Sequence, residues 1–310
     1  MSNSTSLFRL EFLYPRFWPN WLLFGCMALI GRLPYSITTK IGRFIGHLVF
    51  YVGRRRRQTA QINIDLCFPE LNDAERERLL REHFLFMGIA AVETGICWLA
   101  PKAKLQKLLK EIKGEEHLNK ALEAGHGAIL LSCHFTHLEM GGSLLAGYRP
   151  LAAVYKPHKN NPLFEAVMLG SRDAHGRVIS RSDTRGMLRT LRDNLPLWYA
   201  PDQNYKGKFA VFAPFFGINA STNAATSRLA KISKAPVLPF FQERMEDGSG
   251  YRLIIKPPLE NFPSESAQED AARINALFEE EIRRRPAEYL WVHRRFKTRP
   301  PGEEKIYPKK

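Results

Sequence analysis

The chain has 310 residues, of which 45% are hydrophobic, so it can bury one large core or two small ones. Its net charge of +15 comes from the two ends, because residues 1–57 carry a balance of +8 and residues 283–310 a balance of +7. Such basic ends indicate an anionic partner (nucleic acid, an anionic membrane or a phosphorylated substrate), and the 20 Phe, 10 Tyr and 5 Trp favour lipid over nucleic acid.

The first apolar stretch predicts a membrane anchor. Its uninterrupted part, from Trp21 to Ile30, is shorter than the roughly 20 residues that cross a bilayer, while Trp18 and Trp21 suit the headgroup level. Glu11 and the lack of a cleavage site of the A-x-A kind argue against a signal peptide. We therefore expect an uncleaved helix that dips into or spans the membrane.

An amphipathic helix with a basic end is predicted next. Apolar residues repeat at helical spacing from Ile41 to Val52, and four arginines, Arg54 to Arg57, follow Gly53. Anionic lipid would attract such a run, although a solvated charge run or a nucleic-acid patch has the same pattern. We assign residues 1–57 to a membrane anchor with an amphipathic basic segment, and residues 58–310 to a single α/β domain.

The rest of the chain predicts helices and strands in alternation. Asn72 and Glu75 form a capping box for a long helix that reaches about Trp98, and Glu93 inside it is expected to be paired structurally. Residues 102–120 have the pattern of a polar helix. Strands are then predicted at residues 128–131, 151–155, 177–180, 197–200, 236–242 and 251–256, with helices at 162–169, 183–194, 221–232 and 267–285. This order predicts an α/β fold with a mostly parallel central sheet flanked by helices.

The stretch from Gly127 to Gly142, GAILLSCHFTHLEMGG, carries the strongest functional signal. A buried strand ends just before His134, and Glu139 follows five residues later, where a helix should begin. The carboxyl end of a strand is where an open α/β sheet places its chemistry. We expect Glu139 to hold the imidazole in one tautomer, so that His134 takes a proton from a hydroxyl. A strand-end histidine satisfied by a carboxylate is the structural alternative.

Other strand ends are expected to share a cleft with His134. They carry Lys156 in YKP, Asp202 in APDQNY, Phe215 and Gly217 in FFG, and the terminal HRRFKTRP. Ser221 or Thr222 is expected to cap a helix, whose N-terminus would be an anion site as well as a simple cap. Dense arginines suit phosphate or carboxylate groups.

Metal and nucleophile chemistry have little support in the sequence. There is no HExxH, GxSxG or P-loop, and His134, His137 and Glu139 alone make a poor metal site. His137 is expected to be a bystander or to support the site residues without contacting substrate. The four cysteines are far apart and lack a C-x-x-C, which predicts reduced thiols, a cytosol-facing body and no zinc.

The motifs together resemble the late acyltransferases of lipid A biosynthesis, the lauroyl and palmitoleoyl group. The resemblance covers nearly the whole chain and rests on YPRFWPNW, NIDLCFPE, ETG, HFTHLEMGG, WYAPDQNYKG and PAEYLWVHRRFKTRP. The H-x4-E pattern is shared with the broader glycerolipid acyltransferases, so a fold of that kind is implied.

The resemblance implies an enzyme of the bacterial inner membrane, with its catalytic domain on the cytoplasmic face and anionic lipid around it. It would move an acyl chain from acyl carrier protein, its co-substrate, to a 3-hydroxyacyl hydroxyl of a Kdo-bearing lipid A precursor. His134 would be the general base and Glu139 its orienting partner. No cofactor, covalent intermediate or nucleic acid is implied.

The resemblance also implies substrate-binding residues. Arg294 and Arg295 match the family's carboxyl-terminal arginines, expected on the acceptor's phosphates or sugar acids, while Asp202, Phe215 and Gly217 match blocks near the cleft. Lys156 replaces an arginine common in relatives. Arg172 lies in the stretch GSRDAHGR, which differs from the more basic stretch of the relatives, and it is a further candidate. An acyltransferase with another glycolipid or glycerolipid acceptor, and a non-catalytic basic protein that binds membrane or nucleic acid, are the alternatives.

Overall fold

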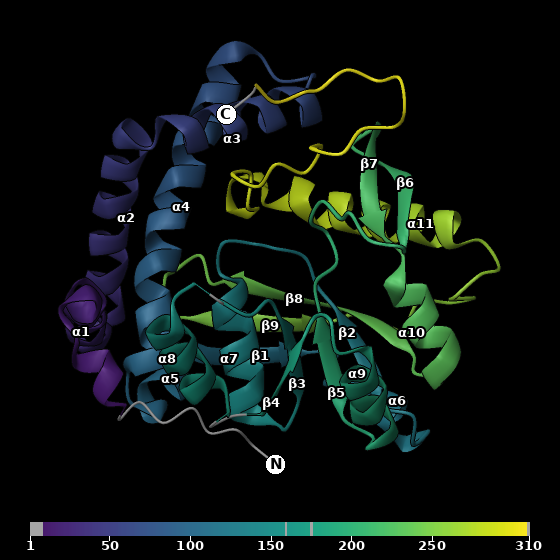
Figure 1. The fold of residues 1–310 in the computed structure, drawn as a ribbon, viewed down its shortest axis with the longest axis horizontal. Helices are drawn as coiled ribbons and strands as arrows, with labels where there is room; N and C mark the ends of the chain where they lie inside the picture. The colour runs from purple at the N-terminus through teal and green to yellow at the C-terminus, as the bar shows by residue number, and fades with distance from the viewer. Residues whose placement is uncertain (1–8, 159, 174–175, 309–310) are drawn as a thin grey trace.

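The computed structural model describes residues 9–158, 160–173 and 176–308, and the side chain of residue 173 lies outside this description. A seven-stranded sheet in the order β1-β9-β8-β2-β5-β3-β4 crosses the molecule (Figure 1). All neighbouring strands in it are parallel except β8 and β9. Its strands are β1 (Leu109–Lys113), β2 (Ala128–Leu131), β3 (Ala152–Tyr155), β4 (Arg177–Ser180), β5 (Pro196–Tyr199), β8 (Val237–Arg244) and β9 (Tyr251–Ile255).

Helices cover both faces of this sheet, as the sequence predicts. They are α4 (Asp73–Leu99), α5 (Lys102–Leu108), α6 (Glu115–Glu123), α7 (Leu138–Tyr148), α8 (Pro162–Asp173), α9 (Thr184–Arg192), α10 (Ala225–Ser233) and α11 (Ala267–Arg284). The central strand β2 is buried on both sides. Ile129 and Leu131 join a core with α9, α10 and α11, whereas Ala128 and Leu130 join a second core with α5, α6 and α7. This explains why β2 is a continuous apolar run.

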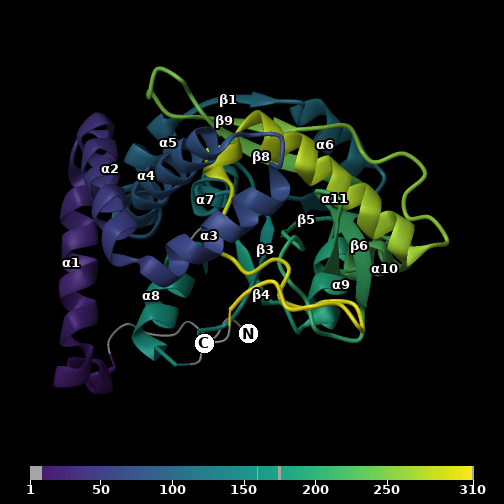
Figure 2. The same ribbon diagram turned by 90° about the horizontal axis from the view of Figure 1, so that it is seen from above.

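The N-terminal helices form one edge of the molecule. The short helices η1 (Leu10–Leu13) and η2 (Pro15–Phe17) lead into α1 (Trp18–Arg32), α2 (Tyr35–Val52) and α3 (Arg54–Cys67). Figures 1 and 2 show α1 and α2 at the edge of the molecule next to α4, and both helices contact α4. The predicted amphipathic helix is thus confirmed as part of α2. The boundary predicted after residue 57 falls inside α3.

The membrane anchor stays a prediction. Within the described residues, α4 is the helix long and apolar enough to cross a bilayer, but half of its apolar window is buried in protein. It packs against α1, α2, α3, α7 and α8, so it is a core helix of the fold. Its capping box between Asn72 and Glu75 is present as predicted.

The predicted helix over residues 102–120 is wrong. The structure has α5, the edge strand β1 and α6 in this segment. Strand β1 pairs with β9 on one side and presents Lys110 and Lys113 to solvent. Charges on an edge strand protect it from pairing with other chains, and they also hide its strand pattern in the sequence.

The predicted helix over residues 221–232 begins later than expected. Residues Ile218–Asn223 form strand β7, which pairs with β6 (Ala210–Phe215) in an antiparallel hairpin, and α10 begins at Ala225. Phe216 and Gly217 form the two-residue turn with φ of 52° and 74°, values that suit a tight hairpin turn. Ser221 and Thr222 therefore lie in a strand, and they do not cap a helix or form the expected anion site.

Candidate functional site

The candidate site begins where two neighbouring parallel strands end together. Leu131 of β2 and Tyr199 of β5 are register partners, and the Ser132 N–H donates to the Tyr199 carbonyl at 2.9 Å. His134 and Asp202 are each the third residue beyond these partners. Equal spacing from aligned strand ends brings the two side chains opposite each other.

The carboxylate of Asp202 contacts both the backbone and the imidazole ring of His134. The His134 N–H donates to Asp202 Oδ2 at 2.9 Å, and His134 Nδ1 lies 2.6 Å from Asp202 Oδ1. The Tyr289 hydroxyl donates to Oδ2 at 2.9 Å. Because a carboxylate can only accept, the proton lies on Nδ1, and Nε2 is left as an acceptor. No other residue in the described part of the chain hydrogen-bonds to Nε2.

The charges of the pair support this assignment. Burial would raise the pKa of Asp202, but the charge of His134 and three hydrogen bonds outweigh it and lower that pKa to about 2. Burial would lower the pKa of His134, but the charge of Asp202 and the hydrogen bond to it outweigh burial and raise that pKa above its ordinary value. Asp202 therefore stays ionised and stabilises a protonated imidazole.

His134 opens onto a cleft of about 710 Å³. Its side chain is 26% exposed, whereas that of Asp202 is 1% exposed and lies behind it. Two other predicted residues, Lys156 and Arg172, also line this cleft. Apolar side chains line it as well, among them Leu138, Met187 and Trp198. The cleft therefore combines one basic nitrogen with cationic and apolar walls.

The expected hydrogen bond between Glu139 and His134 is wrong. Glu139 accepts from the Trp98 indole N–H at 2.7 Å and from Arg172 Nε at 3.0 Å, and it pairs with Arg172 Nη2 as well. The reason is that Glu139 lies in the first turn of α7, from which it reaches α4 and α8, while the loop after β5 supplies the partner of His134. Glu139 holds Arg172 at the edge of the cleft.

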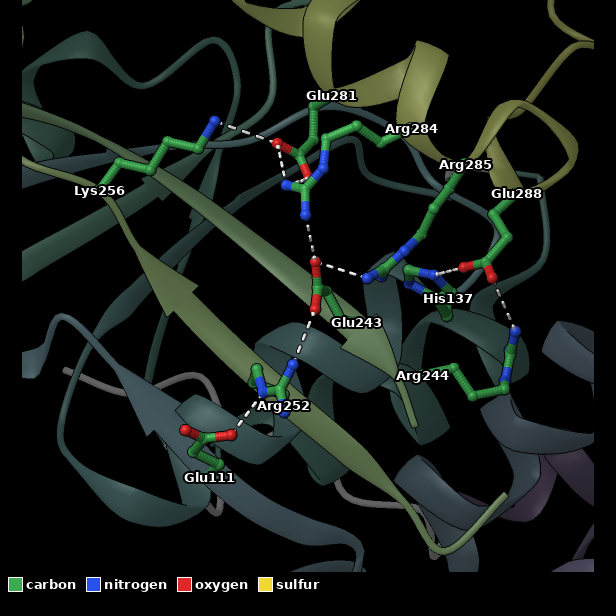
Figure 3. A network of polar contacts seen from close by, with 10 residues as sticks. All are labelled: Glu111, His137, Glu243, Arg244, Arg252, Lys256, Glu281, Arg284, Arg285 and Glu288. Carbon is green, nitrogen blue, oxygen red and sulfur yellow. Dashed lines mark hydrogen bonds and ion pairs between the residues drawn. The ribbon is translucent and has the colours of Figure 1, made fainter. Parts of the chain in front are cut away.

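A second histidine-carboxylate pair is enclosed in the scaffold (Figure 3). His137 is buried, its Nε2 pairs with Glu288, and the Gln242 amide donates to its Nδ1 at 3.0 Å. Burial would raise the pKa of Glu288, but His137, Arg244 and Arg285 lower it to about 2. The pair ties α7 to β8 and to η3 (Pro286–Glu288), so it has a structural role.

The same network contains other buried charges of the scaffold. Glu93 accepts from Tyr35 and Tyr251 at 2.5 Å each and from Arg244 at 3.0 Å, which confirms its predicted structural pairing. Figure 3 shows Arg252, Arg284 and Arg285 directed at the carboxylate of Glu243.

The predicted carboxyl-terminal residues lie away from the cleft. Arg295 is buried, donates to the Ser221 carbonyl at 2.8 Å and to Thr222 Oγ1 at 2.7 Å, and lies 5.1 Å from the centre of the buried Phe215 ring. The expectation that Arg295 and Phe215 bind substrate directly does not fit these contacts, because both hold the β6–β7 hairpin.

Two further predicted residues remain accessible but lie outside the cleft lining. Arg294 lies over the Tyr307 ring at 5.6 Å, and Gly217 is at the exposed hairpin turn. Their proposed contacts with substrate stay predictions. Among the residues that the structure describes, no group of three His, Cys, Asp or Glu side chains could hold a metal ion.

Comparisons with known proteins agree along nearly the whole chain. The family model described as bacterial lipid A biosynthesis acyltransferase matches residues 6–298. The chain is 39% identical over 302 residues to a lipid A biosynthesis palmitoleoyltransferase of Escherichia coli (strain K12), covering 97% of this chain and 98% of that protein. It is 34% identical over 302 residues to a lipid A biosynthesis lauroyltransferase of the same strain, with the same coverage. It is 36% identical over 298 residues to a lipid A biosynthesis acyltransferase of Haemophilus influenzae, covering 94% of each chain.

Proposed function

Because the chain belongs to the bacterial lipid A biosynthesis acyltransferase family and is therefore an acyltransferase, we propose that it acylates a Kdo-bearing lipid A precursor. The donor is an acyl thioester of acyl carrier protein, and the acceptor is a 3-hydroxyacyl hydroxyl of the precursor. The observation that carries this proposal is His134, which is held by Asp202 and exposed to a cleft with cationic and apolar walls.

In this mechanism His134 is the general base. Its Nε2 takes the proton of the acceptor hydroxyl while the hydroxyl oxygen attacks the thioester carbonyl. The C–S bond then breaks, the carrier thiol leaves with the proton from the imidazolium, and the new ester remains. Asp202 keeps the imidazole in the required tautomer and stabilises its charged form. The acceptor attacks directly, so no enzyme nucleophile and no cofactor take part.

The N-terminal edge supports a proposed place at the bacterial inner membrane, with the catalytic domain on the cytoplasmic face. All but two of the exposed large apolar side chains in the described residues lie between Leu10 and Val52. Helix α1 has 15 residues, a length of about 22 Å, which is too short to cross a hydrocarbon core of about 30 Å alone. We therefore propose that α1 and α2 lie in the interface, with exposed Arg54, Arg55 and Arg56 toward anionic lipid.

The test is transfer from acyl-carrier-protein thioesters of C10 to C16 chains to the Kdo-bearing precursor. His134→Ala should lower kcat by about 10²-fold to 10⁴-fold, because general-base catalysis is lost. Asp202→Asn should lower kcat as well, and Glu139→Gln should have a smaller effect. His126→Ala is the control, since His126 is exposed and outside the cleft.

Unchanged transfer in His134→Ala would place the chemistry elsewhere. Transfer by wild-type protein only to another glycolipid or to a glycerolipid would favour a different acceptor.

A further inference from the structure

The cleft that contains His134 has an unusual charge composition. Five exposed cations line it: Lys156 after β3, Arg181 after β4, Lys206 and Lys208 between β5 and β6, and Arg228 on α10. We call these five residues the basic wall. None of the lining residues in the described part of the chain is Asp or Glu.

The described part of the chain does not neutralise the basic wall. Arg172, the sixth cation of the cleft, pairs with Glu139, but none of the five pairs with a carboxylate among the residues that the structure describes. Like charges gathered in a concave site produce a strong positive potential and attract anions. An anionic ligand in the cleft would supply the missing countercharge.

Two cations of the wall contact the same aromatic ring. Lys208 Nζ lies 5.0 Å from the centre of the Phe209 ring, and the Arg228 guanidinium lies 4.9 Å from the same centre. The Phe209 carbonyl accepts from the Ala224 N–H at 3.0 Å, which fixes the ring beside the start of α10. The ring therefore contacts both an ammonium and a guanidinium, the two groups that proteins use to bind phosphate.

We propose that Lys208 and Arg228, assisted by the rest of the basic wall, bind a phosphomonoester of the acceptor lipid. This rests on the proposed function, and it moves the phosphate site from the carboxyl-terminal arginines to the cleft. A phosphomonoester carries close to two negative charges near neutral pH, so it suits several unpaired cations better than the single charge of a phosphodiester in the donor's prosthetic group. The apolar part of the cleft, with Leu138 and Trp198, remains for acyl chain.

The experiment compares a Lys208→Met/Arg228→Met double variant with wild type. Methionine keeps the apolar stem on Phe209 and removes the charge. Equilibrium binding of the radiolabelled bisphosphorylated precursor and of its dephosphorylated form is measured in detergent micelles, and KM is measured for acceptor and donor. Lys231→Met is the matched control, because Lys231 is one turn along α10, outside the cleft, and pairs with Glu265.

The double variant should bind the bisphosphorylated precursor about 10-fold or more weakly, which corresponds to the loss of a charged contact. Its affinity for the dephosphorylated form and its KM for donor should stay within about two-fold of wild type. Equal loss for both forms, no loss, or a raised donor KM instead would overturn the proposal. If wild-type protein binds the phosphorylated precursor in preference but transfers nothing to it, the proposed function fails while the phosphate site stands.

Discussion

Asp202 determines the chemistry of the candidate site, because its two carboxylate oxygens accept three hydrogen bonds. Two come from His134 and one from Tyr289, and all three are shielded from water by the fold. A carboxylate so satisfied remains ionised and pairs with a charged imidazole more readily than an exposed one would. The site therefore depends on a residue that does not itself line the cleft.

The raised pKa of His134 predicts the acid side of the pH profile. His134 must be neutral to accept a proton, so kcat/KM should fall as the pH drops through a value above the ordinary 6.5 of histidine. In Asp202→Asn the carboxylate no longer raises the pKa of His134, so burial should lower that pKa. The fall of kcat/KM on the acid side of the profile (the acid limb) should then move to lower pH, and the rate should decrease. The measurement is kcat/KM between pH 5 and pH 9.

Glu139→Gln is the control for this shift. The charge of Glu139 is already paired with Arg172, so its loss should leave the acid limb in place. A limb that moves in Glu139→Gln and stays in Asp202→Asn would show that Glu139 is the partner of His134 in the working enzyme.

His83 predicts a separate effect of pH on stability. Its ring is buried on α4, Nδ1 donates to the Ala287 carbonyl at 3.2 Å, and burial lowers its pKa from 6.5 to about 4. As the pH falls, the unfolded chain binds a proton at His83 before the folded chain does. The contribution of neutral His83 to the free energy of unfolding is therefore fully present above pH 6.5 and is lost as the pH falls toward 4. The loss is about 3 kcal/mol.

The check is urea unfolding of wild type and His83→Asn at several pH values. Asparagine can donate to the same carbonyl and does not titrate in this range. The free energy of unfolding of the variant should fall less between pH 6.5 and pH 4. An equal fall in the free energy of unfolding for the two proteins would contradict the assignment to His83.

At the scale of elements, the attachment of α2 to α4 depends on glycines. Gly42 and Gly46 of α2 are four residues apart and face Gly88 of α4. A Cβ on Gly88 would lie 2.1 Å from the Gly42 carbonyl oxygen and 2.3 Å from the Gly46 nitrogen. Helices approach this closely only where side chains are absent, as in small-x-x-x-small motifs. These contacts join the N-terminal edge to the domain.

Gly88→Ala should therefore destabilise the protein by about 3 kcal/mol, since the atoms in its way belong to the backbone and cannot turn aside. Thermal unfolding measures the change. Gly25→Ala is the matched control, because Gly25 is also in a helix and has nothing within 4 Å of its added Cβ. A melting temperature for Gly88→Ala as high as that of Gly25→Ala would mean that α2 and α4 are farther apart than described.

At the scale of the whole molecule, apolar exposure is concentrated at one edge. Trp18, Leu22, Leu23 and Leu29 on α1 and Phe44 on α2 are among the exposed side chains there. Figures 1 and 2 show these two helices at that edge. Exposed apolar side chains gathered on neighbouring helices mark an interaction site. The α9, α10 and β6–β7 end of the molecule lies opposite this edge.

A Leu22→Ser/Leu23→Ser/Leu29→Ser variant should bind anionic vesicles at least about 10-fold more weakly, because three exposed leucines no longer enter the interface. Co-sedimentation with vesicles of phosphatidylglycerol and phosphatidylethanolamine measures this. Tyr148→Ser, which removes an exposed apolar side chain elsewhere, should bind as wild type does. Binding that is unchanged in the triple variant would exclude this face as the anchor.

The sequence alone determined the α/β fold, the family and the position of His134. These follow from local patterns, because the apolar run of β2 and the helical periodicity of α2 and α4 reflect the geometry of each element by itself. The sequence also placed Asp202 near the cleft. The strand β7 and the edge strand β1 were missed, since their polar residues match no local pattern. The pairing partner of β1, the strand β9, is also distant in the chain.

Only the tertiary structure decided which carboxylate holds His134 and which cations face the cleft. Glu139 is close to His134 in sequence, but the register of β2 and β5 brings Asp202 to it from 68 residues away. Arg295 looked like a ligand for phosphate, yet its contacts with β7 bury it, and Lys208 and Arg228 face the cleft instead. The physical reason is that partners distant in the chain are selected by strand register and helix crossing, which no local pattern contains.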